Sequence, residues 1–336
     1  MHKRFGMLTA AVLAAGMVFA IPAQADTCRW IVEDIKTPEG YDPASARVSG
    51  TDSKGNFSGT VTIPGQNNGA IVLWTNGEPR VASEFANFNF PQVNDENSAG
   101  TVLVTGVDRA GAGEWGVYLY TGGHIGNGAV TQVQAPEGYR AERGIALNDR
   151  GEVLFSARSS KDEHVVTVLW SMVAARPIVI DTPLGQGVDL DNDGTVLLHA
   201  GNTHPGYLWR AGQIIPLSGK GSFVGSGAIR GGKVVRTEST SPWPEAQSWL
   251  WENPDEPRPI EDGGTAWIIN SNGLIVGGRS THVGPSAVWR NTTLLAELPM
   301  PDGVRDASGV FVVGDDDVIY GDASNYGPLK WSCSYR

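Results

Sequence analysis

A single pattern recurs seven times along the 336-residue chain. Each copy contains a tight turn that closes on glycine, or on aspartate in the last copy, at Gly55, Gly100, Gly151, Gly194, Gly232, Gly273 and Asp317. Each copy also contains an aromatic residue further on, at Trp74, Tyr120, Trp170, Trp209, Trp251, Trp289 and Trp331. Successive members of either series are 38 to 51 residues apart, so two independent markers give the same count. A period of this length is typical of solenoids and rings of supersecondary units.

Each copy is expected to form four short strands. In the clearest copy, residues 268–290, an alternating stretch ends in Asn-Ser-Asn-Gly, a turn whose Asn and Gly tolerate left-handed backbone. An aliphatic stretch, a variable loop, the stretch with the aromatic landmark and a fourth stretch follow. Seven such units predict an all-β fold, a seven-bladed β-propeller of four-stranded blades. A linear β-solenoid is the alternative, although its repeats are usually shorter. The 44 Gly and 20 Pro residues disfavour a helical bundle.

The two ends of the chain are complementary. Residues 28–35 resemble a fourth strand, whereas the last copy stops after its third strand at residues 329–333. The N-terminal strand is therefore expected to complete the last blade, which leaves the ring without an open edge. This arrangement places Cys28 and Cys333 on neighbouring strands, and in a secreted protein we expect them to form a disulfide.

Residues 1–25 are predicted to be a secretory signal peptide, and residues 26–336 a single propeller domain. A basic start, His2-Lys3-Arg4, precedes an apolar run and the small residues of Ala23-Gln24-Ala25. A membrane anchor is the alternative, but the run is too short and wrongly flanked for a stable span. We therefore expect a secreted, extracellular monomer without membrane association. The formal net charge of −11 disfavours nucleic acid as a partner.

The run from Ile269 to Gly277, followed by Trp289, resembles the HAF repeats of secreted bacterial proteins. Weaker copies cover essentially the whole chain after residue 25, and the fifth and seventh depart furthest from the pattern. The resemblance implies a secreted repeat architecture. It carries no functional residues over to this chain.

One turn also matches the start of a calcium-binding loop. Asp189, Asp191 and Asp193 precede Gly194 at the spacing of oxygen ligands, which makes them weak metal candidates. However, Ala200 stands where such a loop needs Glu, and every copy of the pattern has a turn here. We favour an ordinary turn, and therefore no cofactor, with calcium as the alternative.

The loops between second and third strands hold the candidate ligand-binding residues. Loops at one end of a rigid scaffold commonly carry function. Amide, hydroxyl and aromatic groups together suit sugar or peptide recognition, because flat apolar faces stack and polar edges form hydrogen bonds. The candidates are Trp115, His164, His204, Trp243, His282 and Tyr326. Ordinary loop composition is the alternative explanation.

The sequence contains no Gly-x-Ser-x-Gly elbow, no His-Glu-x-x-His and no phosphate-binding loop. We therefore expect a secreted recognition module for a carbohydrate, a cell-envelope polymer or an extracellular protein. A lyase or hydrolase that uses loop residues such as Glu163, His204 and His282 is the competing hypothesis. A purely structural extracellular protein is the third.

Overall fold

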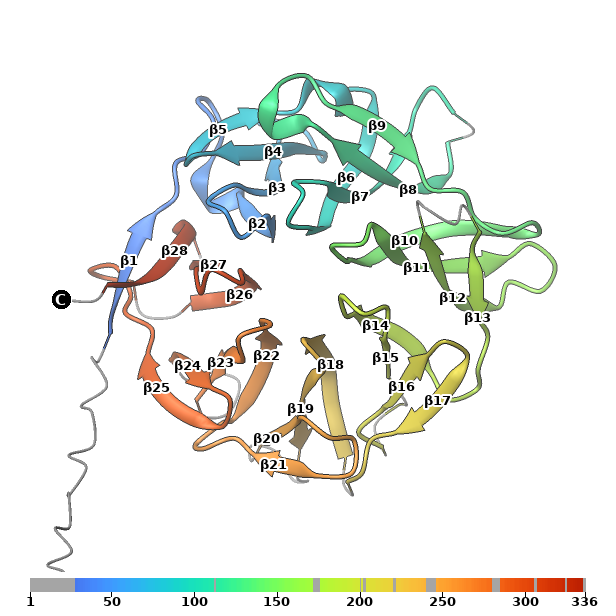
Figure 1. Cartoon of the computed structure of the whole chain (residues 1–336). Coiled ribbons are helices and arrows are strands. Elements are labelled where there is room, and N and C mark those ends of the chain that lie inside the picture. Colours follow the sequence, from blue (N-terminus) through green and yellow to red (C-terminus); the bar gives the residue numbers. More distant parts are fainter. Residues whose placement is uncertain are drawn as a thin grey trace, which may run out of the picture.

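Seven four-stranded antiparallel sheets form a closed ring around a central axis (Figure 1). The structure is a computed structural model, and it describes residues 28–334 except 112, 172–175, 200, 202–203, 220–221, 240–245, 280–284, 305–306 and 324. The described residues contain no α-helix and three short 3₁₀ turns, at Pro43–Ser45, Ser83–Phe85 and Gly123–Ile125. The prediction of a seven-bladed β-propeller is confirmed. The predicted signal peptide and the candidates Trp243 and His282 lie outside the described residues.

The four strands of each blade run in order from the axis to the rim, as Figure 1 shows. The innermost strands of blades one to seven are β2 (Arg47–Thr51), β6 (Phe88–Glu96), β10 (Tyr139–Leu147), β14 (Gln186–Leu190), β18 (Ser222–Arg230), β22 (Thr265–Ile269) and β26 (Ala307–Val313). The second strands are β3 (Phe57–Thr62), β7 (Val102–Asp108), β11 (Glu152–Ser159), β15 (Val196–His199), β19 (Lys233–Ser239), β23 (Leu274–Gly278) and β27 (Ile319–Ala323).

The third strands are β4 (Gly69–Thr75), β8 (Trp115–Thr121), β12 (Val165–Ser171), β16 (Tyr207–Arg210), β20 (Ala246–Trp251), β24 (Ser286–Arg290) and β28 (Gly327–Ser334). The fourth strands are β5 (Glu78–Val81), β9 (Ala129–Gln132), β13 (Ile178–Ile180), β17 (Gln213–Pro216), β21 (Pro257–Pro259), β25 (Thr293–Glu297) and, for blade seven, β1 (Arg29–Asp34).

Both repeated landmarks have a structural role. The seven turn residues all have left-handed backbone, from a φ of 61° at Asp317 to 93° at Gly55. Four of the third-strand tryptophans are at most 1% exposed and pack in apolar clusters between blades. Their Nε1–H groups donate to the carbonyl of the second residue after the preceding blade's fourth strand. These pairs are Trp74–Lys36 (2.6 Å), Trp251–Ser218 (2.9 Å), Trp289–Glu261 (2.6 Å) and Trp331–Pro299 (2.7 Å).

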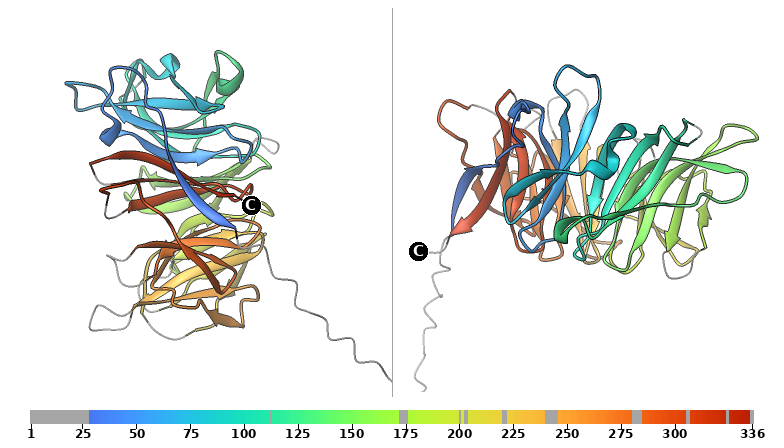
Figure 2. Two further views of the ribbon diagram at one scale, coloured as in Figure 1. Left: turned by 90° about the vertical axis from the view of Figure 1, so that its left-hand side faces the viewer. Right: turned by 90° about the horizontal axis from the view of Figure 1, so that it is seen from above.

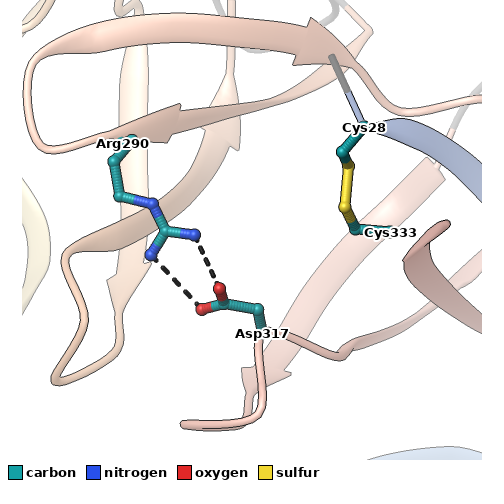
Figure 3. Close-up of a disulfide and its surroundings, with 4 residues drawn as sticks. All are labelled: Cys28, Arg290, Asp317 and Cys333. Atoms are coloured by element: carbon teal, nitrogen blue, oxygen red, sulfur yellow. Dashed lines mark hydrogen bonds and ion pairs between the residues drawn. A yellow bond between two sulfur atoms is a disulfide. The ribbon is translucent and has the colours of Figure 1, made fainter. Parts of the chain in front are cut away.

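The ring is closed by the two ends of the chain. Strand β1 pairs antiparallel with β28, and the two lie side by side at the outer edge of the disc (Figure 2). Cys28 and Cys333, 305 residues apart, form a disulfide with a Cα–Cα distance of 5.6 Å (Figure 3). Nearby, Arg290 of blade six makes a two-pronged ion pair with Asp317 of blade seven, at 2.6 and 3.3 Å. The predicted closure and disulfide are both confirmed.

No helix in the described part of the chain has the length and apolar character that crossing a bilayer requires.

Candidate functional site

A cavity of about 460 Å³, the central cavity, lies among the innermost strands of all seven blades. Its rim consists of turns between first and second strands, such as Asp52–Lys54 and Asp149. It therefore opens at the end of the ring opposite to the loops between second and third strands, because successive turns of a meander alternate ends. One arc of its wall is polar and comes from blades one and two. The adjoining arc, from blades six and seven, is apolar and includes Trp267, Val312 and Val313.

A repeated β-bulge supplies many of the residues that line this cavity. Six of the seven innermost strands have a register shift at an equivalent place. In β6 the pairing passes from Val93 directly to Asp95 and leaves no residue opposite Asn94. A bulge re-aims the side chain of its extra residue and is frequent beside functional sites. In five blades this residue lines the central cavity: Ser49, Asn94, Ile145, Val188 and Trp267.

Arg230, at the end of β18, joins three blades across the rim of the cavity. Its Nη1 lies 3.5 Å from the Asp189 carboxylate of blade four, and its Nη2 lies 3.7 Å from the Asp95 carboxylate of blade two. Nη1 also donates to the backbone carbonyls of Leu190 and Ile229. Burial opposes the charge of Arg230, but its carboxylate neighbours, Asp189 first, raise its pKa. The guanidinium is thus held as a cation at the rim.

The two aspartates beside Arg230 have equivalent inter-blade roles. Asp95 accepts a hydrogen bond from Leu147 N–H of blade three (2.8 Å), and Asp189 accepts one from Ile229 N–H of blade five (2.7 Å). Burial raises the pKa of both carboxyls, and for Asp95 the value reaches about 6 despite the opposing charge of Arg230. Asp95 is therefore a carboxyl in the cavity that titrates well above its usual range.

The raised pKa of Asp95 predicts a pH-dependent loss of stability. Between pH 3.8 and about 6 the folded protein binds this proton more tightly than the unfolded chain does, so rising pH removes stability over that window. Asp95→Asn cannot titrate, and we expect the wild type to lose roughly 1–3 kcal/mol relative to this variant across the window. Urea unfolding of both proteins at pH 4 and pH 6.5 measures the difference. A difference that does not change with pH contradicts the expectation.

Two of the three candidate calcium aspartates, Asp189 and Asp191, hold blades together. Asp191 is buried and accepts from Gly231 N–H (2.9 Å) and Gly232 N–H (2.7 Å) of blade five. Asp193 accepts from Thr195 N–H (2.8 Å) and lies 3.3 Å from an arginine of its own blade. Asp189 accepts a hydrogen bond from Ile229 N–H and lies beside Arg230. The three carboxylates therefore each bind different N–H groups instead of converging on one point. Over the part of the chain that the structure describes, no three His, Cys, Asp or Glu side chains are grouped to hold a metal ion.

These contacts predict a structural, calcium-independent role for Asp191. Asp191→Ala leaves two turn amides without their acceptor, and we expect it to lower the free energy of unfolding by about 2 kcal/mol. Asp193→Ala, at a more exposed position, is the matched control and is expected to cost less than about 1 kcal/mol. Millimolar calcium should leave the thermal midpoint of the wild type unchanged. A midpoint that rises with calcium in the wild type, but not in Asp191→Ala, would restore the calcium hypothesis.

A second concavity, the Trp115 groove, lies between blades two and three. It has a volume of about 360 Å³ and is formed by the β7–β8 loop, the end of β9 with the residues after it, and the start of β10. The Trp115 side chain is 46% exposed, and its ring centroid lies 6.3 Å from that of the exposed Phe90. Tyr118 and Tyr139 also line the groove, and its polar lining residues are Asp108, Glu114, Gln132, Gln134 and Arg140.

The structure places the other described candidates at separate points on the same end of the ring. His164 is exposed and lies 3.3 Å from Asp181, whereas the His204 ring is parallel to that of Tyr207 at 4.5 Å. Burial lowers the pKa of His204. The Tyr326 hydroxyl donates to Asp34 across the closing strand pair (2.8 Å).

Among the candidate loops, as far as the structure describes them, that of His164 is connected to the Trp115 groove. The connection is an ion pair between Arg140, which lines the groove, and Glu163, at 2.7 Å. None of the four described candidates lines the central cavity. That any of them binds a ligand stays a prediction.

Sequence reasoning missed the central cavity and its residues Asp95, Arg230 and Trp267. Asp95 and Asp189 lie two residues before the repeated turn in blades two and four, where other blades have apolar or small residues such as Ala146 and Ile268. That departure from the pattern was a signal that could have marked them. No residue pattern in the sequence marks the bulges. A bulge is defined by how the strand pairs with its neighbour, and this pairing is not visible in the sequence.

Comparison with protein-family models and with curated protein sequences gave no match. Among solved structures, the chain is similar to an oligogalacturonate lyase in complex with manganese, with a TM-score of 0.60 and 12% identity over 92% of this chain and 96% of that one. It is also similar to the oligogalacturonate lyase of Vibrio parahaemolyticus, with a TM-score of 0.58 and 9% identity over 92% and 98% of the two chains.

A third similar structure is YCF48 from Cyanidioschyzon merolae, with a TM-score of 0.53 and 9% identity over 89% of this chain and 98% of that one. Identities this low establish the shared propeller fold and leave the activity open. The side chains that the structure describes also offer no three-ligand group for an ion such as the lyase's manganese. The class that fold and geometry define is therefore a seven-bladed β-propeller in which the central cavity and the Trp115 groove lie at opposite ends of the ring.

Proposed function

We propose that the protein is a secreted recognition module that binds a saccharide in the Trp115 groove. The exposed indole of Trp115 carries this proposal, because it lines a groove together with two tyrosines and several polar side chains. Flat aromatic faces stack on the apolar faces of sugar rings, while amide and guanidinium groups such as those of Gln132 and Arg140 bind hydroxyls at the edges. A single exposed aromatic residue on a loop would lack these neighbouring aromatic and hydrogen-bonding side chains.

The disulfide supports an oxidising location outside the cytosol. The proposal includes secretion through the predicted signal peptide. It also includes the assignment of the blades as HAF repeats. Saccharides of the cell envelope or of the surroundings are the ligands that such a location offers. An extracellular protein bound by the same groove is an outcome of the test described below.

A polysaccharide lyase is the second candidate, and the fold likeness to two oligogalacturonate lyases favours it. Two features of this chain weigh against a lyase that acts on oligogalacturonate. Six carboxylates and only two cationic side chains line the central cavity, which would repel a polyanion. Of the residues considered for catalysis, Glu163 is paired with Arg140 and His204 is stacked on Tyr207.

Glycan-array binding by the full secreted chain, followed by calorimetry with the best ligand, tests the proposal. Trp115→Ala should weaken binding roughly tenfold or more. Tyr326→Ala, which removes another exposed aromatic ring far along the chain from the groove, is the matched control and should bind like the wild type. Equal binding by wild type and Trp115→Ala contradicts the proposal. Release of unsaturated products from oligogalacturonate would support the lyase instead. Binding of a protein but of no glycan would show that the ligand is an extracellular protein.

A further inference from the structure

We propose that the central cavity is a second binding site, which takes a small organic cation with an apolar body. This site is independent of the proposed saccharide groove, since it opens at the opposite end of the ring. It is formed by the innermost strands of seven blades near their ends in the first-to-second-strand turns, whereas the groove is formed by the β7–β8 loop, the residues around the end of β9 and the start of β10. A volume of about 460 Å³ accommodates a small molecule.

The side chains that define the cavity are not dictated by the scaffold. The bulge recurs in six blades, yet the residue it turns into the cavity is Ser, Asn, Ile, Val or Trp in the five blades whose bulge residue lines the cavity. Positions that only maintain the ring keep one kind of residue, as the third-strand aromatic position does with six tryptophans and Tyr120. The bulge position has the same backbone geometry in these blades but carries different side chains, so its side chains can determine which ligand the cavity binds. Trp267 is the largest of the five.

The lining is two-sided in a way that suits an amphipathic ligand. Trp267, Val312 and Val313 form the apolar wall on blades six and seven. Ser49 and Asn94 lie on the polar wall of blades one and two, which follow directly around the ring. A ligand with its apolar body against Trp267 can therefore present its polar end to the hydroxyl, amide and carboxylate oxygens of the adjoining wall.

The charges around the cavity select a cationic polar end. Its lining contains six carboxyl groups, of which Glu96 is turned toward His124 between blades one and two, and the other five are those of Asp52, Asp95, Asp149, Asp189 and Asp315. The two cationic lining residues are already engaged: the Lys54 ammonium donates to Ser98 carbonyl (2.6 Å), and Arg230 is held by Asp189 and by backbone carbonyls. Arg230 also shows that this rim holds an organic cation stably. An aromatic face such as Trp267 adds cation–π attraction for a second one.

Calorimetric titration of the full chain with benzylammonium tests the inference, with benzyl alcohol and benzoate as neutral and anionic probes of the same shape. We expect benzylammonium to bind roughly tenfold more tightly than benzyl alcohol, and benzoate not to bind. Trp267→Leu keeps an apolar side chain but removes the aromatic face, and it should weaken benzylammonium binding roughly fivefold. Val188→Lys adds a positive charge at a bulge position and should abolish binding, whereas Val188→Thr should retain it.

Trp115→Ala separates this site from the saccharide groove and should bind benzylammonium like the wild type. Circular dichroism of each variant establishes that it is folded. Equal affinity for benzylammonium and benzyl alcohol, no benzylammonium binding by the folded wild type, or binding unaffected by both Trp267→Leu and Val188→Lys would each overturn the inference. Loss of glycan binding alone would leave it standing, because the two sites share no lining residue.

Discussion

Replacing Cys28 and Cys333 together by serine is expected to lower the free energy of unfolding by about 2–5 kcal/mol. The bond joins residues 305 positions apart, so its loss restores much freedom to the unfolded chain. Loss of the disulfide also removes the covalent link between β1 and β28, so the strand pair that closes the seventh blade opens more readily. An opened blade exposes an unpaired strand edge, which favours association between chains.

Urea unfolding and light scattering measure these two effects. The wild type treated with a reductant is the matched control and should lose the same stability as the double variant. The single variant Cys28→Ser should add disulfide-linked dimers, because Cys333 then has a free thiol. An unchanged free energy of unfolding in the double variant would contradict the closure described above.

Glu96→Ala is expected to cost about 3–5 kcal/mol, because it leaves two buried groups, His124 Nε2 and the Ser58 hydroxyl, without their hydrogen-bond partner. The Glu96 side chain is fully buried between blades one and two, and its carboxylate lies 2.8 Å from His124 Nε2 and accepts from the Ser58 hydroxyl at 2.7 Å. His124 Nδ1 in turn lies 3.0 Å from the Thr75 hydroxyl. Burial raises the pKa of Glu96, and the contacts with His124 and Ser58 oppose that rise.

A double-mutant cycle with His124→Ala separates the pair from the surrounding packing. The two single variants should each be strongly destabilised, and the double variant should cost clearly less than their sum. Glu96→Gln keeps the volume and one acceptor and should cost less than Glu96→Ala. Additive losses in the cycle would show that the two side chains do not interact.

The contacts within and between neighbouring blades could be predicted from the sequence because they recur. Gly273 and Asp317 occupy equivalent turns with positive φ, and Trp289 and Trp331 make equivalent hydrogen bonds to the preceding blade. The last copy stops after its third strand at Cys333, and residues 28–35 resemble a fourth strand, which likewise predicted the closure. Each of these features repeats at the period of the blades or follows from the first and last copies.

The central cavity could not be predicted because its residues meet only across the ring. Arg230 approaches Asp95 of a blade that is not its neighbour, and this contact depends on the ring's diameter and on the length of one side chain. Asn94 and Trp267 line the cavity through bulges, which shift register without any change in the repeated pattern. The loop residue Trp115 could be singled out, but its groove also needs Tyr139 from the next blade.

Hydrogen–deuterium exchange of the full chain, with and without the saccharide chosen by the array, tests the central claim most directly. Occupation of the Trp115 groove should slow exchange in the β7–β8 loop, in the residues after β9 and at the start of β10, while the rim of the central cavity exchanges as before. Protection confined to the turns between first and second strands, or to the outer strands of other blades, would contradict the claim that this groove is the recognition site.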